Sequence, residues 1–573
     1  MRLTLSKSKN SVNFYVIKSV TINGKRTTKV IEKLGNEKEV TIKAKGENPY
    51  VWARNYVKLL NKEEKEMGKD ILIRLSQTKD LDKNKQFTFN GGYLFLQQIY
   101  YDLGLNHICD EISSKYQFKY DLNSILSNLI YSRIIYPSSK LKTLELSENF
   151  IEKPNFDYNH ILRSLEVISK ETDYIQSKLY KNSLSYSKRN DKILYYDCTN
   201  YYFEIEEEDG LKRYGKSKEN KPNPIIGMGL FMDGDGIPLA FDITAGNTNE
   251  QVTLKPLEEK IINDFGNAKF VVCTDAGLAS NNNRKFNNTN NRRFITTQPI
   301  KKLKTFLKEW ALDLTGDWKL PGSDKTYDIS GLRNDDKLIN TFKNKTFYKE
   351  RWIKENNLEQ RLIITYSVKY QEYQKNLREN QITRALKLIK SNSEKINKAG
   401  QNDPKRFIVT IDTTSTGEVA TEKYHTINKE LVLEESKYDG LYAICTNLED
   451  NVEDIIKINN RRWEIEESFR IMKSEFKARP VFLSREDRIK AHFTTCFLAL
   501  IIYRYLEKIL DNKYTVTEII ETLRNYNLRE LPGFGYIPLY KVTNLIASLH
   551  SKFNIDTNKE IITYKNMIKF TKK

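Results

Sequence analysis

Two short apolar runs, each ending in an aspartate, constrain the fold of this chain more than any other feature. Residues Ile193–Asp197 and Phe270–Asp275 are rich in Ile, Val, Tyr and Phe, which is the composition of buried strands. An acid at the end of such a strand lies at the rim of a sheet, where the neighbouring core holds it in place. We therefore expect a sheet that presents Asp197 and Asp275 at its rim.

A third acid, Glu466, lies in a cationic stretch that predicts a helix over residues 452–476. On a wheel of about 100° per residue, one stripe of this helix has the spacing of a buried face. That stripe contains Ile458, Ile465, Phe469, Met472 and Phe476. A second stripe contains Asn459, Arg462, Glu466 and Lys473. The wheel therefore selects Glu466 as the acid at the edge of the core, whereas Glu467 is expected to face solvent.

Three carboxylates brought together can hold divalent cations for phosphoryl transfer, and cationic side chains around them can hold phosphates. The helix pattern alone also fits a plain exposed helix with i,i+4 ion pairs, Arg462–Glu466 among them. The two strand-end aspartates and the order of the predicted strands favour the first interpretation.

The charge of the chain favours a polyanionic partner. Its 573 residues contain 94 Lys and Arg against 75 Asp and Glu, which gives a formal net charge of +19. Such an excess is typical of proteins that bind nucleic acid. A Lys- and Asn-rich composition inherited from an AT-rich genome would produce part of the same excess, so charge alone is modest evidence.

Cysteine usage and hydropathy indicate a cytoplasmic protein. The five cysteines contain no C-x-x-C pair, which argues against a zinc site or a disulfide framework. The first residues contain no apolar signal-peptide core. The longest apolar stretch, Cys496–Tyr503, is far shorter than the ~20 residues that span a bilayer. We therefore expect no membrane association.

Changes in periodicity divide the chain into regions. Alternation over residues 12–35 predicts a β-hairpin with its turn at Asn23–Gly24. The expected regions are a β-hairpin region (1–50), a helical region (51–190), a mixed α/β sheet in two parts (191–299 and 438–512), an insertion between them (300–437) and a C-terminal helical appendix (513–573). The basic helical region is either a DNA-binding domain or a plain helical bundle.

At this point the chain resembles the DDE transposases of bacterial insertion sequences. It is most similar to the class whose third acid lies in a Tyr-x2-Arg-x3-Glu-x6-Lys signature. Arg462, Glu466 and Lys473 match that signature at the right spacing, whereas Asn459 occupies the position of the tyrosine. The resemblance extends to Asp197–Asn200, Gly246–Thr248, Thr274–Gly277, Arg479–Phe482 and His492. It covers residues 190–300 and 438–510 well.

The resemblance implies a ribonuclease H-like core, interrupted by a β-rich insertion, that cleaves and transfers DNA strands. It implies two Mg²⁺ (or Mn²⁺) ions, with Asp197 bridging both and with Asp275 and Glu466 each favouring one. Arg462, Lys473 and Asn459 would contact DNA phosphates. The expected partners are double-stranded DNA, at the terminal repeats of the element and at its target, and a second copy in a synaptic dimer. The bound protein would associate with the nucleoid.

Two other functions fit the same residues, and several other conspicuous residues have ordinary structural explanations. A catalytically silent DNA-binding descendant and a structure-selective nuclease on the same fold both stay open, although the intact acids favour activity. Asp233 and Asp235 lie at a Gly-rich turn, where ordinary turn chemistry is expected. His492 is expected to be a structural histidine on an apolar helix. Trp310, Trp318 and Trp352 are each expected in a core rather than against an extruded base.

Overall fold

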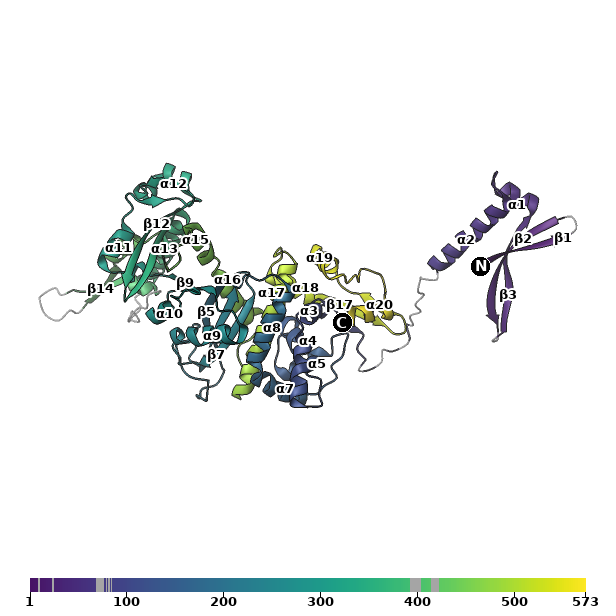
Figure 1. Cartoon of the computed structure of the whole chain (residues 1–573), viewed down its shortest axis with the longest axis horizontal. Coiled ribbons are helices and arrows are strands. Elements are labelled where there is room, and N and C mark those ends of the chain that lie inside the picture. Colours follow the sequence, from purple (N-terminus) through teal and green to yellow (C-terminus); the bar gives the residue numbers. More distant parts are fainter. Residues whose placement is uncertain are drawn as a thin grey trace. The chain divides into compact units, whose positions relative to one another are not determined.

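The computed structural model describes residues 1–8, 11–22, 25–67, 77–78, 80, 83, 85–391, 403–413 and 422–572. The chain divides into two compact units (Figure 1). The first is Met1–Gln86 with Pro532–Phe534, and the second is Phe87–Leu531 with Gly535–Lys573. In the described part of the chain, no helix is long and apolar enough to cross a bilayer.

The first unit is a three-stranded antiparallel sheet with two helices. Its elements are β1 (Arg2–Ser8), β2 (Ser11–Ile22), β3 (Lys25–Asn36), α1 (Glu37–Lys43) and α2 (Pro49–Met67). Phe14, Val16 and Leu34 of the sheet and Val40 of α1 are buried together. The pairing of β2 with β3 confirms the predicted hairpin, while its expected turn at Asn23–Gly24 lies outside the described residues.

The second unit begins with a short strand, β4 (Thr88–Asn90), and a block of helices. These are α3 (Tyr93–Asp102), α4 (Leu105–Tyr116), α5 (Leu122–Ile135), α6 (Lys140–Ser147), α7 (Tyr158–Lys170) and α8 (Thr172–Tyr186). The long apolar helix α17 (Glu486–Ile509) packs against α3, α5 and α7. The helical block and the strands that follow it therefore share one continuous core.

The central strands have the order and directions of a ribonuclease H-like core. They are β5 (Ile193–Tyr202), β6 (Ile225–Asp233), β7 (Pro238–Ala245), β8 (Phe270–Thr274) and β9 (Arg292–Thr297). In space the order is β7-β6-β5-β8-β9. The first three strands are antiparallel neighbours, and β8 and β9 continue parallel to β5. The predicted fold class is thus confirmed.

The inserted segment lengthens this sheet. Strand β16 (Leu441–Thr446) pairs with β9 on one side and with β13 (Leu358–Ser367) on the other. The sheet then continues through β12 (Thr346–Glu355), β10 (Trp318–Lys319) and β11 (Thr326–Tyr327). The strands β14 (Ile408–Thr413) and β15 (Glu422–Ile427) form a separate ribbon. The helices of this segment are α11 (Thr305–Leu312), α12 (Asp336–Phe342), α13 (Val368–Lys390) and α14 (Lys429–Ser436).

Strand alternation assigns the two faces of the sheet to different cores. Tyr195, Cys273 and Ile295 pack in the core that contains α17. The intervening residues Tyr196 and Val272 pack in the second core, which includes α9 (Leu254–Lys260). Helices α15 (Val452–Asn460) and α16 (Trp463–Arg470) belong to the first core, so they lie on the face to which odd-numbered residues of β5 point.

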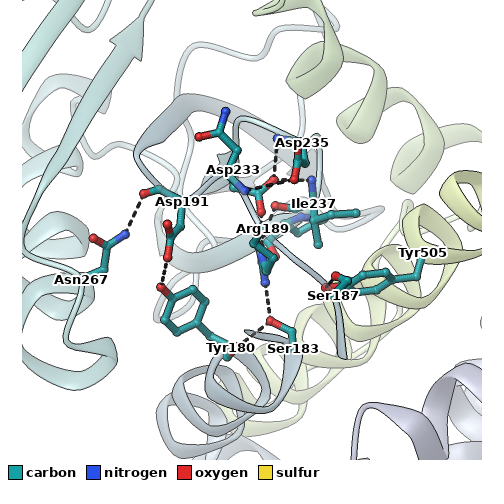
Figure 2. Close-up of polar contacts among 12 residues, drawn as sticks. Tyr180, Ser183, Ser187, Arg189, Asp191, Asp233, Asp235, Ile237, Asn267 and Tyr505 are labelled. Atoms are coloured by element: carbon teal, nitrogen blue, oxygen red, sulfur yellow. Dashed lines mark hydrogen bonds and ion pairs between the residues drawn. The ribbon is translucent and has the colours of Figure 1, made fainter. Parts of the chain in front are cut away.

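The turn between β6 and β7 is stabilised by a buried ion pair, shown in Figure 2. Arg189 Nε lies 2.6 Å from Asp233 Oδ2, and both side chains are buried. Asp233 Oδ1 also accepts the backbone N–H groups of Asp235 and Ile237. Burial raises the pKa of Asp233 although Arg189 opposes the rise, so desolvation offsets much of the attraction. The expected turn role of Asp233 and Asp235 agrees with these contacts.

The C-terminal region is less helical than its sequence pattern predicts. It contains α18 (Val516–Asn525), β17 (Asn527–Leu531), β18 (Gly535–Pro538), α19 (Asn544–Phe553), β19 (Ile562–Thr563) and α20 (Tyr564–Thr571). Its strands join β4 in a sheet of order β19-β18-β17-β4. Strands this short carry almost no alternation, and the partner strand β4 lies more than 400 residues earlier in the chain, so local sequence patterns miss them.

Candidate active site

Asp197 and Asp275 come after the same row of paired residues in the parallel strands. Tyr195 pairs with Cys273, and Cys273 pairs with Ile295. Asp197 and Asp275 each lie two residues beyond this row. Asp275 follows the end of β8 as expected, whereas Asp197 lies within β5, which continues to Tyr202, so its expected strand-end position was wrong. Burial raises the pKa of Asp197 to about 6; Lys218 opposes the rise and the charge of Asp275 adds to it. Two like charges held near each other in a partly buried place create a site that attracts a cation.

Glu466 lines the same pocket as Asp197, together with Phe469 and Lys473. Four residues of the predicted apolar stripe are buried, namely Ile465, Phe469, Met472 and Phe476, whereas Ile458 is half-buried. The carboxylate of Glu466 is itself 59% exposed and lies 3.5 Å from Arg462 Nη1. The helix thus presents Glu466 on the open, pocket side rather than at a covered edge.

Glu467 differs from its predicted environment. Its side chain is 25% exposed and accepts a hydrogen bond from Arg470 at 2.7 Å. It lines a different pocket, with Glu464 and Lys508. The expectation that Glu467 faces solvent was therefore wrong, because the residues around Lys508 cover that side of the helix. Only Glu466 of the two shares a pocket with Asp197.

The three acids do not surround one point in this structure. Among the described residues, no group of three His, Cys, Asp or Glu side chains is arranged to hold a metal ion. Asp197 and Asp275 interact, and Glu466 contacts Arg462 instead. Carboxylates are the ligands that Mg²⁺ prefers, so the residue types fit a divalent cation, and Glu466 lines the same pocket as Asp197.

The predicted phosphate contacts lie beside these acids, with different exposures. Arg462 is 20% exposed, and its Nε has no hydrogen-bond partner in the described structure. Lys473 is 13% exposed and lies 3.2 Å from Glu219. Burial, followed by the charge of Lys218, lowers the pKa of Lys473 to about 8, although Asp197 opposes the shift. Asn459 is 5% exposed, so it lies behind Arg462 rather than at the surface.

The loop between β5 and β6 contributes site residues that sequence reasoning missed. Lys218 lies 3.0 Å from Glu250 and donates a hydrogen bond to the carbonyl of Cys198, next to Asp197. Glu219 contacts both Lys473 and Arg479. The cationic run Lys216–Lys221 between two predicted strands is the one local signal that points to this loop.

Tyr442 of β16 is a second missed residue. Its hydroxyl lies 2.5 Å from Thr297 Oγ1 and accepts a hydrogen bond from Asn459 Nδ2 at 3.4 Å. Thr297 lies two residues beyond Ile295 and so continues the row of Asp197 and Asp275. Asn459 stands where the resembled signature has tyrosine, and a phenol from another strand contacts it. Tyr442 therefore brings a tyrosine hydroxyl next to Asn459, the position at which this sequence lacks the tyrosine of the signature.

The remaining aromatic and histidine residues agree in part with their expected structural roles. His492 is buried and hydrogen-bonded to the carbonyl of Ala478 at 3.2 Å. Trp318 is 0% exposed, as expected for a core residue. Trp352 is 47% exposed, so the expectation of a core position was wrong for it. Glu350, Arg351 and Lys354 of the same strand are exposed as well.

Comparison with known proteins gives a family and two distant structures. The model of the transposase DDE domain matches residues 203–502, more than half of the chain. This range includes Asp275 and Glu466 and begins shortly after Asp197. No curated protein matches significantly.

Two of the similar solved structures are complexes of transposases with DNA. The piggyBac transposase synaptic complex with hairpin DNA is 9% identical, covers 84% of each chain and has a TM-score of 0.32. The Mos1 transposase paired-end complex with the left transposon end is 8% identical and has a TM-score of 0.13. That alignment covers 40% of this chain and 64% of the other.

Proposed function

Because the chain belongs to the transposase DDE domain family, we propose that it is the transposase of a bacterial insertion sequence. It cleaves DNA strands at the ends of its element and transfers them to a target. The observation that carries this proposal is the interaction of Asp197 with Asp275 beside a pocket that Glu466 lines. Structural scaffolding alone gives no reason to hold the charges of two acids near each other in a partly buried place.

Asp197, Asp275 and Glu466 are the proposed ligands of Mg²⁺ or Mn²⁺, two ions in all. When bound, such ions activate a water or a 3′-hydroxyl and stabilise the leaving oxygen of an in-line displacement. Asp197 is the expected bridging ligand, since it shares surroundings with both other acids. Glu466 has to leave Arg462 to join them, and its exposed side chain leaves room for that movement.

The cations around the acids are the proposed contacts to the DNA backbone. Arg462, Lys473 and Lys218 all interact electrostatically with Asp197. A phosphodiester beside Asp197 would therefore meet three charged donors. Asn459 acts through Tyr442 and Arg462 rather than by direct contact, because its side chain is buried.

Recognition of the element's ends is proposed to lie mainly within residues 1–190, with the insertion at 300–437 adding contacts. The motive is the basic, helical character of the segment before β5. The proposed partners are double-stranded DNA and a second copy of the chain in a synaptic dimer. With those partners, the protein is proposed to act in the cytoplasm, in association with the nucleoid.

Two alternative functions predict different results when the protein is incubated with DNA. A catalytically silent descendant would bind the same ends without cutting them. A structure-selective nuclease would cut junctions without preference for one terminal sequence. The retention of all three acids, with Asp197 and Asp275 in electrostatic contact, favours the active transposase over the silent descendant.

The decisive experiment uses the DNA that flanks the protein's own gene. The full chain is incubated with this DNA and Mg²⁺, and cleavage is mapped to the nucleotide, with Asp197→Asn as the matched control. Cuts at the two element ends, absent in EDTA and in the control, are expected. Cuts that follow branched structures regardless of sequence would instead establish the nuclease.

A further inference from the structure

A second cationic pocket lies next to the active site. It is a cavity of about 530 Å³ at the start of α6 and beside the segment that follows the signature helix. Its cationic lining comprises Arg133, Lys140, Lys477 and Arg479, and the ring of His492 completes one wall. No aspartate or glutamate is among the described residues that line it. The pocket thus has an excess of positive charge, of which only that of Arg479 is balanced, by Glu219 outside the lining.

Lys140 is the residue at which this excess of positive charge most opposes folding. Its side chain is 6% exposed, and its Nζ is buried without a hydrogen-bond partner in the described structure. Burial, followed by the charge of Arg133, lowers the pKa of Lys140 to about 7. Burial and the same two cations lower the pKa of His492, which is therefore neutral. A buried cation without a partner destabilises the fold unless an anion joins it.

The backbone around Lys140 also favours an anion. Ser139 caps α6 by accepting the N–H of Lys142 on its hydroxyl, and the N-terminus of a helix attracts negative charge. Arg133 donates to the carbonyls of Phe476 and Ser138, so it ties the two walls of the pocket together. The unpartnered Lys140 supplies the independent evidence that the helix terminus alone would not.

Arg479 connects this pocket to the catalytic one, since it lines both. It contacts Glu219, which in turn contacts Lys473 beside Asp197. A DNA strand whose scissile phosphate lies at Asp197 would therefore have neighbouring phosphates within reach of Arg479.

We propose that this pocket binds a backbone phosphate of the DNA strand that enters the active site. The proposal rests on the proposed function for the identity of the polyanion. The unpaired charge of Lys140 is retained for binding, at a cost in stability that a bound phosphate offsets.

The first test measures stability and DNA binding of Lys140→Met in the same preparation. Binding of a labelled duplex carrying the element end is measured by fluorescence anisotropy in EDTA over a range of salt concentrations. The variant should unfold at a higher temperature than the wild type, because a buried unpaired charge is removed. It should bind DNA roughly tenfold more weakly, with a salt slope smaller by about 0.9. Lys142→Met, an exposed lysine of the same helix paired with Glu145, should change neither quantity.

The second test adds charge without disturbing the helix cap. Asparagine and aspartate are both good N-cap residues, so Ser139→Asp and Ser139→Asn differ chiefly by one negative charge at the pocket. The aspartate variant should bind DNA at least tenfold more weakly than the asparagine variant. Inorganic phosphate at millimolar concentration should raise the unfolding temperature of the wild type more than that of Lys140→Met if the pocket also accepts a free anion.

The proposal would be overturned if the two Ser139 variants bound DNA with equal affinity, within twofold. It would also be overturned if Lys140→Met had a lower unfolding temperature than the wild type and unchanged DNA binding. A phosphate effect without any difference in DNA binding would assign the pocket to a free anion and equally reject the DNA contact. All binding is measured in EDTA, so a failure of the catalytic assignment leaves these results unaffected.

Discussion

Replacing Asp197 by asparagine should stabilise the protein while it abolishes cleavage. The carboxyl pKa is about 6 in the folded chain against an ordinary value of 3.8. A difference of about two units corresponds to roughly 3 kcal/mol at about 1.4 kcal/mol per unit. Above pH 6 the folded chain therefore carries a penalty of up to about 3 kcal/mol for keeping this carboxylate charged. Asparagine has the same shape and removes that penalty.

The pH dependence follows from the direction of the shift. A raised carboxyl pKa means that the folded chain holds the proton more tightly than the unfolded chain. Stability is thus lost as the pH rises from about 4 to 6, and the loss is complete above pH 6. The advantage of Asp197→Asn should be largest at pH 7.5 and should disappear near pH 4.

Urea unfolding of both proteins at pH 4 and pH 7.5, in EDTA, measures this advantage. Asp313→Asn is the opposite-sign control, because hydrogen bonds from Thr315 lower the pKa of Asp313. That variant should lose stability at pH 7.5. Added Mg²⁺ should stabilise the wild type and not Asp197→Asn. An Asp197→Asn protein that is less stable than the wild type at pH 7.5 without metal, or equally stabilised at both pH values, would refute the reasoning.

Three further predictions concern the same fold. Glu466→Gln should reduce end cleavage by orders of magnitude and Glu467→Gln should retain it, in one gel assay; the opposite result would reject the site assignment. Tyr442→Phe should slow cleavage roughly tenfold or more by removing a hydroxyl near the phosphate contacts, and adding Asn459→Tyr should recover part of the rate; full activity of Tyr442→Phe would contradict this role. Asp233→Ala should lower the free energy of unfolding by about 3–5 kcal/mol, because Arg189 is left buried without a charged partner; an unchanged urea midpoint would rule this out.

The catalytic sheet could be predicted because its evidence is local. The residues before Asp197 in β5 and before Asp275 in β8 form continuous apolar runs, and the polar turn before β7 marks where the chain reverses. The pairing of β2 with β3 is local in the same sense. The place of Glu466 was also readable, since the buried stripe of its helix fixes the faces of that helix.

The rest of the site is assembled by distant contacts, which a single sequence does not encode locally. Tyr442 reaches Thr297 across 145 residues, and this contact exists only because the insertion returns as a strand of the same sheet. Lys218 and Glu219 lie in an aperiodic loop, so no hydrophobic pattern indicates that they fold against Asp197. The environment of Glu467 depended on residues near Lys508 that cover one side of the helix.

The signature helix itself is three segments rather than one, and its breaks explain the contacts of its polar side chains. Between α15 and α16 the backbone N–H groups of Arg462 and Ile465 bond to residues three positions earlier, Asn459 and Arg462. A tight turn of this kind aligns residues i and i+3, so Asn459 lies directly behind Arg462 and meets Tyr442. After α16 the chain forms a wide turn of π-helix at Ile471–Glu475, the kind of irregularity that recurs at functional sites. The wider turn brings Lys473 next to Glu219. The regular turns of α16 keep Glu466 on the side of the helix that faces the pocket. The signature residues therefore span a tight turn, a regular helix and a wide turn. A wheel with a constant angle per residue predicts the side of the helix on which Glu466 lies, but it does not predict the surroundings of the neighbouring residues.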